Sequence, residues 1–234
     1  MTIFQKGNYA TMRKKINMDD GFNAELVETA FFDGILEIPQ IQPPKEFVIP
    51  ERMIPINKLS ASVDHHEMIV PYVFDTEFGD IVRNPQAYVK IFRQFPAMAS
   101  LDNSLYIDSP LAVQIANVYR SRAIAYYFQS QGINVIPNIR WGDERSYTTC
   151  VLPECFAFLG IPKHSIVCLG TYGACQTKEE KLYMRNGLIA MLDILSPEVV
   201  LVYGSMSDRI FHGLYDRTRF IQYPDWTSAK KKGA

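Results

Sequence analysis

The stretch IVCLGTYGACQTKEEKLYMRNGLIAMLDILSPEVVLVY, residues 166–203, decides the fold. Its two ends, IVCL and VVLVY, are short continuous apolar runs, which are typical of strands buried on both faces of a parallel sheet. Between them, Thr177 and Glu180 have the spacing of a capping box, and Pro197 predicts where the helix has ended. A strand, a helix and a second strand in this order indicate a right-handed βαβ unit.

The same alternation continues on both sides of this unit. Strands are predicted at 68–74, 97–99, 105–107, 133–139 and 219–223. Helices are predicted at 85–95, 110–131 and 207–215, and the lysines at 230–232 predict a frayed tail. About six βα units in sequence predict an α/β fold with a mostly parallel sheet. We expect a TIM-barrel-like or incomplete barrel, with an open three-layer sheet as the alternative.

The first 59 residues have a different character. Prolines at 39, 43, 44, 50 and 55 exclude a helix there and predict an extended arm. A short helix near 24–32 and a strand near 35–38 are predicted before this arm. We therefore expect an N-terminal extension with a proline-rich arm at 1–59 and an α/β domain at 60–234.

Composition excludes several classes of protein. The chain has 234 residues, 24 Lys and Arg against 25 Asp and Glu, and 47% hydrophobic residues, which argues against disorder. It has no apolar run of the roughly 18 residues that a membrane helix needs, so no membrane partner is expected. The near-zero net charge does not favour nucleic acid as a partner. We see no secretory signal and expect a cytoplasmic protein with free cysteines.

Candidate site residues are those that follow the strands, because ligands bind at the carboxyl ends of the strands in either architecture. The densest cluster is Arg140-Trp141-Gly142-Asp143-Glu144. Its residue types predict a general base at Asp143 or Glu144 and an anion clamp at Arg140. The carboxylates are also suitable ligands for a divalent metal, and the cofactor remains unknown. In the alternative interpretation, Arg140 pairs with a carboxylate and Asp143 or Ser146 caps the next helix.

Further candidates follow other strands. Asp102 is a third catalytic candidate, and the substrate-binding candidates are Arg140, Trp141, Asp108, Gly170, Thr171, Gly173 and Tyr203. The turns after 166–169 and 199–203 are glycine-containing and precede helices, so their N–H groups could hold an anion. Glycines that only permit tight turns are the alternative.

Other conspicuous groups are interpreted as structural. Asp64-His65-His66-Glu67 leads into the amino end of a strand, and its two histidines point to opposite faces in extended chain, so no metal site is predicted. The four cysteines lack Cys-x-x-Cys pairs. Arg120 and Arg122 are predicted to lie on a solvated helix face.

The residues 100–110, 132–144, 160–162 and 170–173 together resemble a family of phage, prophage and mobile-element proteins known as domain of unknown function 4417. The resemblance covers about residues 69–226. It implies an accessory protein of a phage, plasmid or conjugative element and carries over no activity. By motif position it favours as site residues Asp102, Asp108, Arg140, Asp143 and Glu144.

Two functions follow as hypotheses. The first is a hydrolase or transferase acting on a nucleotide, sugar or other phosphate-bearing small molecule at the strand ends. The second is a non-enzymatic protein that binds or inhibits a host protein or ligand, for which an exposed apolar patch is expected. Whether the chain is an enzyme stays open at this point.

Overall fold

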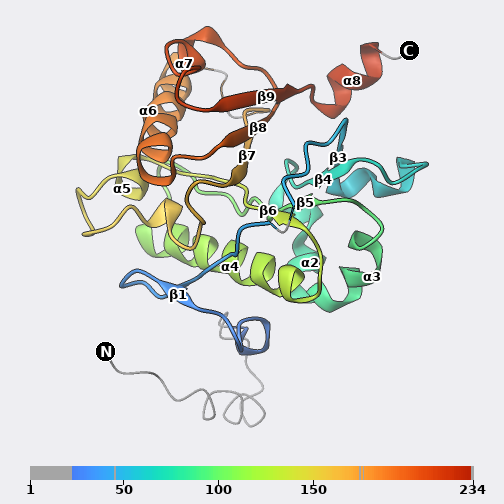
Figure 1. The fold of residues 1–234 in the computed structure, drawn as a ribbon. Coiled ribbons are helices and arrows are strands. Elements are labelled where there is room, and N and C mark those ends of the chain that lie inside the picture. The colour runs from blue at the N-terminus through green and yellow to red at the C-terminus, as the bar shows by residue number, and fades with distance from the viewer. Residues whose placement is uncertain (1–22, 45, 174, 176, 233–234) are drawn as a thin grey trace.

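Two parallel sheets form the centre of the part of the chain that the computed structural model describes, residues 23–44, 46–173, 175 and 177–232 (Figure 1). The first sheet has the order β3 (Met53–Pro55), β4 (Met68–Val70), β5 (Met98–Ala99) and β6 (Val135–Ile136). The second has the order β7 (Ile166–Gly170), β8 (Val199–Tyr203) and β9 (Arg219–Tyr223). Both sheets therefore follow the chain order, as successive βα units require.

In the described part of the chain, one isolated bridge connects the two sheets. Asn138 pairs with Cys168 in parallel orientation, and the Ile139 and Cys168 N–H groups donate to Cys168 O and Pro137 O at 2.9 and 2.8 Å. Among the described residues, no strand pairing joins β9 to β3, so the TIM-barrel-like closure is not confirmed. The Tyr223 hydroxyl instead donates to the Pro50 carbonyl at 2.7 Å.

Side chains on the two faces of the strands belong to two separate cores. An inner cluster consists of strand residues and residues that flank the strands: Met53, Met68, Val70, Tyr72, Ala97, Ala99, Ile136, Ile166, Cys168, Val199, Leu201, Tyr203 and Tyr223. Alternate residues such as Ile54, Ile69 and Val200 pack with helices in the outer core. Because strands face strands across the inner cluster, the arrangement differs from an open three-layer sheet, in which helices cover both faces.

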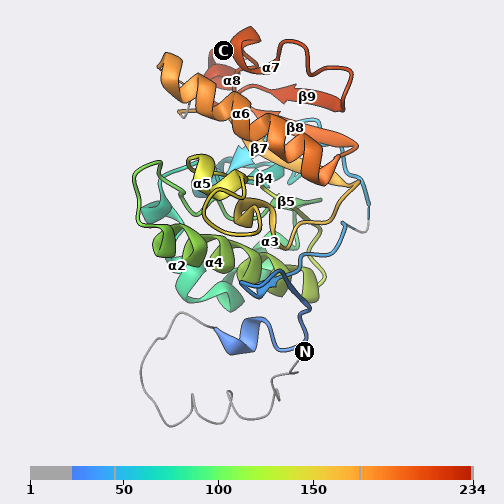
Figure 2. The same ribbon diagram turned by 90° about the vertical axis from the view of Figure 1, so that its left-hand side faces the viewer.

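Helices pack on the outer side of the strands. Figures 1 and 2 show α6 (Lys178–Leu195) along β7–β9, and α4 (Leu111–Ser130) near β6. The shorter helices are α2 (Gly79–Arg83), α3 (Val89–Phe92), α5 (Glu144–Tyr147), α7 (Asp208–Phe211) and α8 (Trp226–Lys232). No helix within the described ranges has both the length and the apolar character needed to cross a membrane.

Several short elements connect these parts. The 3-10 helices are η1 (Ala24–Leu26), η2 (Ile56–Ala61), η3 (Asp75–Glu77), η4 (Pro85–Tyr88) and η5 (Phe156–Phe158). The strands β1 (Phe32–Asp33) and β2 (Ile38–Pro39) form an antiparallel hairpin.

The predicted elements of the second half are confirmed most closely. The strands at 199–203 and 219–223 match β8 and β9, and the capping box of Thr177 and Glu180 opens α6. The helix at 110–131 is confirmed as α4. The predicted frayed tail is wrong, because Lys230 belongs to α8, whose first turn is capped by Asp225 through the Ser228 N–H at 3.0 Å.

The predicted strands of the first half are shorter than expected. β4 ends before Pro71, and β6 ends before Pro137, because proline has no N–H to donate to a neighbouring strand. The helix predicted at 85–95 is divided into η4 and α3. In place of the helix predicted at 24–32, the chain forms η1 and the start of the hairpin.

The predicted boundary at residue 59 remains a prediction. β3 lies before this boundary and pairs in register with β4, with Ile54 opposite Ile69. The first 22 residues of the predicted extension, and Lys45 of its proline-rich arm, lie outside the described residues.

Candidate functional site

A buried ion pair lies at the carboxyl ends of β5 and β6. Arg140 Nε donates to Asp102 Oδ1 at 2.9 Å, and Arg140 Nη2 forms a second bond to Asp102 Oδ2. The Asp102 side chain is 5% exposed and that of Arg140 is 24% exposed. Burial lowers the pKa of Arg140, but the charge of Asp102 and its hydrogen bonds outweigh burial and raise it. Arg140 therefore stays charged, and its side chain is partly accessible to solvent.

Asn138 and Tyr72 extend this pair toward the inner cluster. Asn138 Nδ2 donates to Asp102 Oδ1 at 2.8 Å, and the Tyr72 hydroxyl donates to Asn138 Oδ1 at 2.9 Å. The same hydroxyl lies 3.0 Å from Cys168 Sγ. Burial raises the pKa of Tyr72 well above its ordinary value, with Cys168 and Asp102 adding to the shift. The phenol is therefore a neutral hydrogen-bonding group.

Arg122 places a second guanidinium beside the pair from the buried side of α4. It donates to the carbonyls of Ala157 at 3.0 Å and Leu159 at 3.1 Å, and it is 3% exposed. Burial lowers the pKa of Arg122 to about 10, against the charge of Asp102. In the described part of the chain, no carboxylate lies within ion-pair distance of Arg122. The prediction that Arg122 lies on a solvated face is wrong.

These five residues, Tyr72, Asp102, Arg122, Asn138 and Arg140, form what we call the rim cluster. It contains two guanidinium groups and one carboxylate, while its tyrosine and asparagine are neutral. One buried positive charge is therefore left without a carboxylate of its own. Burying such a charge is costly unless an anion or hydrogen bonds compensate for it.

Aromatic rings lie next to the rim cluster. The rings of Tyr72 and Tyr203 stack with a centroid distance of 5.1 Å, and Tyr172 meets Tyr203 edge-on at 6.2 Å. Tyr172 is 50% exposed, whereas Tyr203 is buried. A Cβ at Gly170 would lie 2.3 Å from the Tyr72 ring, so glycine is needed for this close packing.

The turn at 170–173 is predicted from the sequence to hold an anion with its N–H groups, but the donors of Thr171 are already used in hydrogen bonds. Its N–H donates to Tyr203 O at 3.0 Å, and its hydroxyl donates to Ser205 O at 2.9 Å. Gly173 has a φ of 76°, which suits glycine in a turn. α6 begins at Lys178, and its cap is occupied by Thr177 and Glu180. The turn is therefore separated from the helix N-terminus that was expected to hold an anion.

Asp143 binds Arg145 rather than Arg140. Arg145 Nε donates to Asp143 Oδ1 at 2.9 Å, and Asp143 also accepts the Arg145 N–H at 3.0 Å as the cap of α5. The side-chain bond from Arg145 is the main reason why the pKa of Asp143 is lowered. The alternative interpretation, in which Asp143 caps the next helix, is thus confirmed. The catalytic roles of Asp143 and Glu144 remain predictions.

The other members of the predicted cluster diverge. Glu144 is exposed on α5, and Asp108 is exposed in the loop before α4. Arg145 Nη2 holds this loop through the carbonyls of Ile107 and Ser109, at 3.1 and 3.2 Å. Trp141 is buried and meets Phe158 edge-on at 6.3 Å. The structure thus brings together Asp102 and Arg140. Glu144, Asp108 and Trp141 take no part in this ion pair.

Trp141 packs so closely on α6 that a larger residue at Gly187 is expected to lower the free energy of unfolding. A Cβ at Gly187 would lie 2.2 Å from Trp141 Nε1. Replacing a helix glycine by alanine gains about 1 kcal/mol from helix propensity, while overpacking a core costs about 1–3 kcal/mol. We expect Gly187→Ala to lower the free energy of unfolding by about 1 kcal/mol, measured by urea denaturation. A more stable variant would show that the indole ring moves freely.

A metal site is not apparent. Within the ranges that the structure describes, no group of three or more His, Cys, Asp or Glu side chains could hold a metal ion. Cys175 lies near Arg140, but burial outweighs that charge and raises the pKa of Cys175 to about 11, so it is a thiol at neutral pH.

Comparisons with known proteins place the chain in a family. The model of the family described as "Domain of unknown function (DUF4417)" matches residues 30–224. The Gene 1 protein of Mycobacterium phage L5 is 32% identical over 141 residues, which are 60% of this chain and 57% of the relative. The Gene 1 protein of Mycobacterium phage D29 is 31% identical over 135 residues, 58% of this chain and 47% of the relative.

The chain thus matches only about half the length of these two relatives. No solved structure matches it. The relatives are encoded by phages, which agrees with the phage association expected from the resemblance. The family match covers more than half of the sequence, and the chain belongs to the DUF4417 family.

Proposed function

We propose that this protein binds a small anionic ligand at the carboxyl ends of its central strands, with Arg140 as the contact for the anion. The excess of positive charge in the rim cluster, two guanidinium groups against one carboxylate, carries this proposal. Asp102 pairs with Arg140, Arg122 is held by backbone carbonyls, and the Arg140 side chain is 24% exposed. A guanidinium that a bidentate carboxylate holds in place is preorganised to bind a second oxyanion with its free N–H groups.

The finer proposal concerns catalysis and the nature of the ligand. A nucleotide, sugar or other phosphate-bearing small molecule would place its phosphate at Arg140, and a ring could stack on the exposed face of Tyr172. In a hydrolase or transferase, we propose Glu144 on α5 as the general base because of its exposed carboxylate and not because of a contact with Arg140. Asp102 and Asp143 are each held by an arginine, whereas Glu144 has no ion pair among the described residues. The cytoplasmic location and the accessory role remain part of this proposal.

Isothermal titration of the full chain with inorganic phosphate and with AMP tests the binding proposal. We expect Arg140→Met to weaken binding at least about 30-fold, which corresponds to about 2 kcal/mol for a lost charge-assisted contact. Arg120→Met is the matched control, because among the described residues Arg120 donates within its own helix, to Asn117 Oδ1 at 2.8 Å. Equal affinities of wild type and Arg140→Met would refute the site.

Catalysis is tested separately from binding. Phosphate release from a panel of nucleotides and sugar phosphates should fall in Glu144→Gln, while the affinity for AMP stays unchanged. If the wild type bound AMP but released no phosphate, the anion site would stand and the hydrolase proposal would be refuted.

The alternative function, a non-enzymatic binder of a host protein, is favoured by the β1–β2 hairpin. Phe31 and Ile35 in this hairpin are 73% and 66% exposed. Glu154 holds the turn by accepting the Ile35 and Leu36 N–H groups at 3.0 and 3.2 Å. Large exposed apolar side chains on a fixed hairpin are typical of protein contacts. A partner bound in this way would be lost in Phe31→Ser and retained in Arg140→Met.

A further inference from the structure

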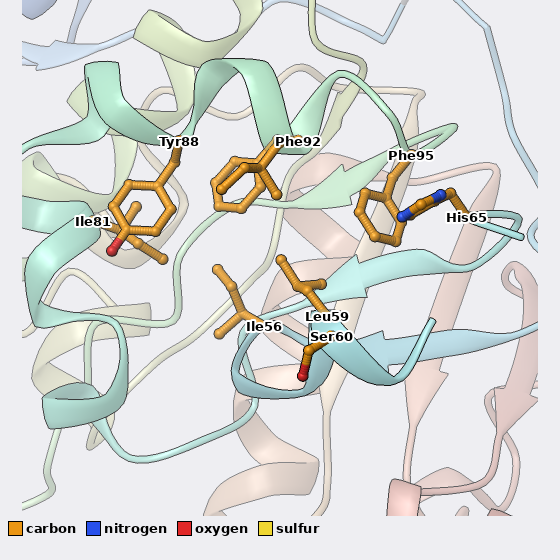
Figure 3. Close-up of a pocket in the computed structure, with 9 residues that line it drawn as sticks. Ile56, Leu59, Ser60, His65, Ile81, Tyr88, Phe92 and Phe95 are labelled. Atoms are coloured by element: carbon orange, nitrogen blue, oxygen red, sulfur yellow. The ribbon is translucent and has the colours of Figure 1, made fainter. Parts of the chain in front are cut away.

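A hollow that shares no residue with the rim cluster lies in another part of the described structure. It has a volume of about 280 Å³ and opens between η2 and α3 (Figure 3). Its lining residues are Ile56, Leu59, Ser60, His65, Ile81, Tyr88, Ile91, Phe92 and Phe95. None of them belongs to the rim cluster, so the two sites can be tested independently.

The walls of the hollow are aromatic on one side and aliphatic on the other. Tyr88 and Phe92 lie one turn apart on the helical segment η4–α3, and Phe95 lies in the turn after α3, where its N–H donates to Phe92 O at 3.1 Å. Ile56 and Leu59 of η2 lie across from them, as Figure 3 shows. Aromatic rings of this kind favour edge-to-face or offset contact with another ring.

His65 is the polar side chain that faces the hollow, beside Phe95, whereas the hydroxyl of the exposed Ser60 points away from the aromatic rings (Figure 3). The His65 ring meets Phe95 edge-on at a centroid distance of 4.8 Å. The backbone of His65 has a φ of 55°, in the left-handed region that residues with a Cβ rarely adopt. Its backbone N–H donates to Ser62 Oγ at 3.1 Å, which fixes the backbone of the residue that carries the imidazole. Strain of this kind is maintained where a side chain must point in one direction.

We propose that this hollow binds a small aromatic molecule that carries one hydrogen-bonding group. The ring packs against Phe92 and Phe95, and its polar group bonds to the imidazole of His65. An apolar cavity of about 150 Å³ is enough to bind benzene in another protein, so a hollow of about 280 Å³ accommodates a substituted or fused ring.

The surface around the hollow favours a small ligand over a protein partner. Lys58, Lys90 and Gln94 are exposed polar residues on the elements that form it. A stable protein interface buries roughly 800 Å² on each side and needs an apolar centre of matching size. Of the lining residues, Ile91 is the one large apolar side chain that is exposed, at 41%.

Indole is a suitable probe, because it combines a fused aromatic ring with a single N–H donor. Saturation-transfer NMR and isothermal titration of the full chain should give saturable binding at one site, with a Kd of about 1 mM or below for a ligand of this size. Leu59→Trp fills the hollow from its aliphatic side and should weaken binding at least about tenfold. His65→Ala should weaken it several-fold.

The controls separate this site from the rest of the molecule. Val63→Trp introduces the same side chain at a 93% exposed position close by, and it should bind indole like the wild type. Arg140→Met should also bind indole normally. Non-saturable binding, or a Leu59→Trp variant that is folded by circular dichroism and binds indole as tightly as the wild type, would overturn the proposal.

Discussion

Asp102→Asn is expected to lower the free energy of unfolding by about 3–5 kcal/mol, because it leaves buried arginines without their carboxylate. Asp102 accepts from Arg140 and from Asn138, and it lies near Arg122. The amide has the size of the carboxylate but no charge, so the change removes the electrostatic contribution without making a cavity. Urea denaturation followed by circular dichroism measures the effect.

Asp108→Asn is the matched control for this variant. Asp108 is exposed, and the same chemical change there should alter stability by less than about 0.5 kcal/mol. If Asp102→Asn were within 1 kcal/mol of the wild type, the ion pair would not hold the strand ends together, and the preorganisation of Arg140 would lose its basis.

Arg122→Met is expected to have two effects. It removes the donors to the carbonyls of Ala157 and Leu159, and two buried carbonyls without partners cost about 2–5 kcal/mol of stability. It also removes the unpaired positive charge. At a distance on the order of 10 Å and an effective dielectric constant of about 20, that charge contributes about 1.7 kcal/mol, so phosphate should bind roughly 20-fold more weakly.

Both effects are measurable at a temperature where the variant is folded. Arg120→Met again serves as the control, since Arg120 donates to Asn117 Oδ1, and among the described residues Arg122 rather than Arg120 binds these carbonyls. Unchanged phosphate affinity in a folded Arg122→Met variant would show that the net charge of the rim cluster does not drive binding. A lower stability of Arg122→Met without weaker phosphate binding would contradict this role of the net charge.

Local patterns in the sequence predict much of the fold. VVLVY at 199–203 is apolar at every position, and the structure buries all of β8. Thr177 and Glu180 specify the start of α6 through their own hydrogen bonds, so no distant contact is needed to predict it. The strands before Pro71 and Pro137 are shorter than predicted, because apolar character alone does not indicate where pairing stops.

The candidate site could be predicted only in part. Asp102 and Arg140 each follow a strand, and neighbouring parallel strands bring them together, so their position in the pattern is informative. Asp143 and Glu144 are adjacent to Arg140 in sequence, but α5 starts between them and turns both toward other surroundings. Sequence proximity is therefore a poor guide to side-chain contact at a strand end.

Little in the sequence pattern indicates that Tyr72 and Arg122 belong to the rim cluster. Tyr72 looks like an ordinary strand residue, and only the tertiary fold brings its hydroxyl to Asn138. Arg122 occupies a helix position that composition predicts to be solvated, because arginine is seldom buried. Its burial depends on the carbonyls of the segment around η5, and nothing in the local pattern of α4 indicates that these lie opposite.

The position of a bound anion in a crystal shows whether Arg140 is the anion contact. Crystals of the full chain grown with tungstate, a strong anomalous scatterer that resembles phosphate, would locate it. The account predicts an anomalous peak within hydrogen-bond distance of the Arg140 guanidinium, which disappears in Arg140→Met. A structure with no peak there, or with tungstate only at other arginines such as Arg52, would contradict it.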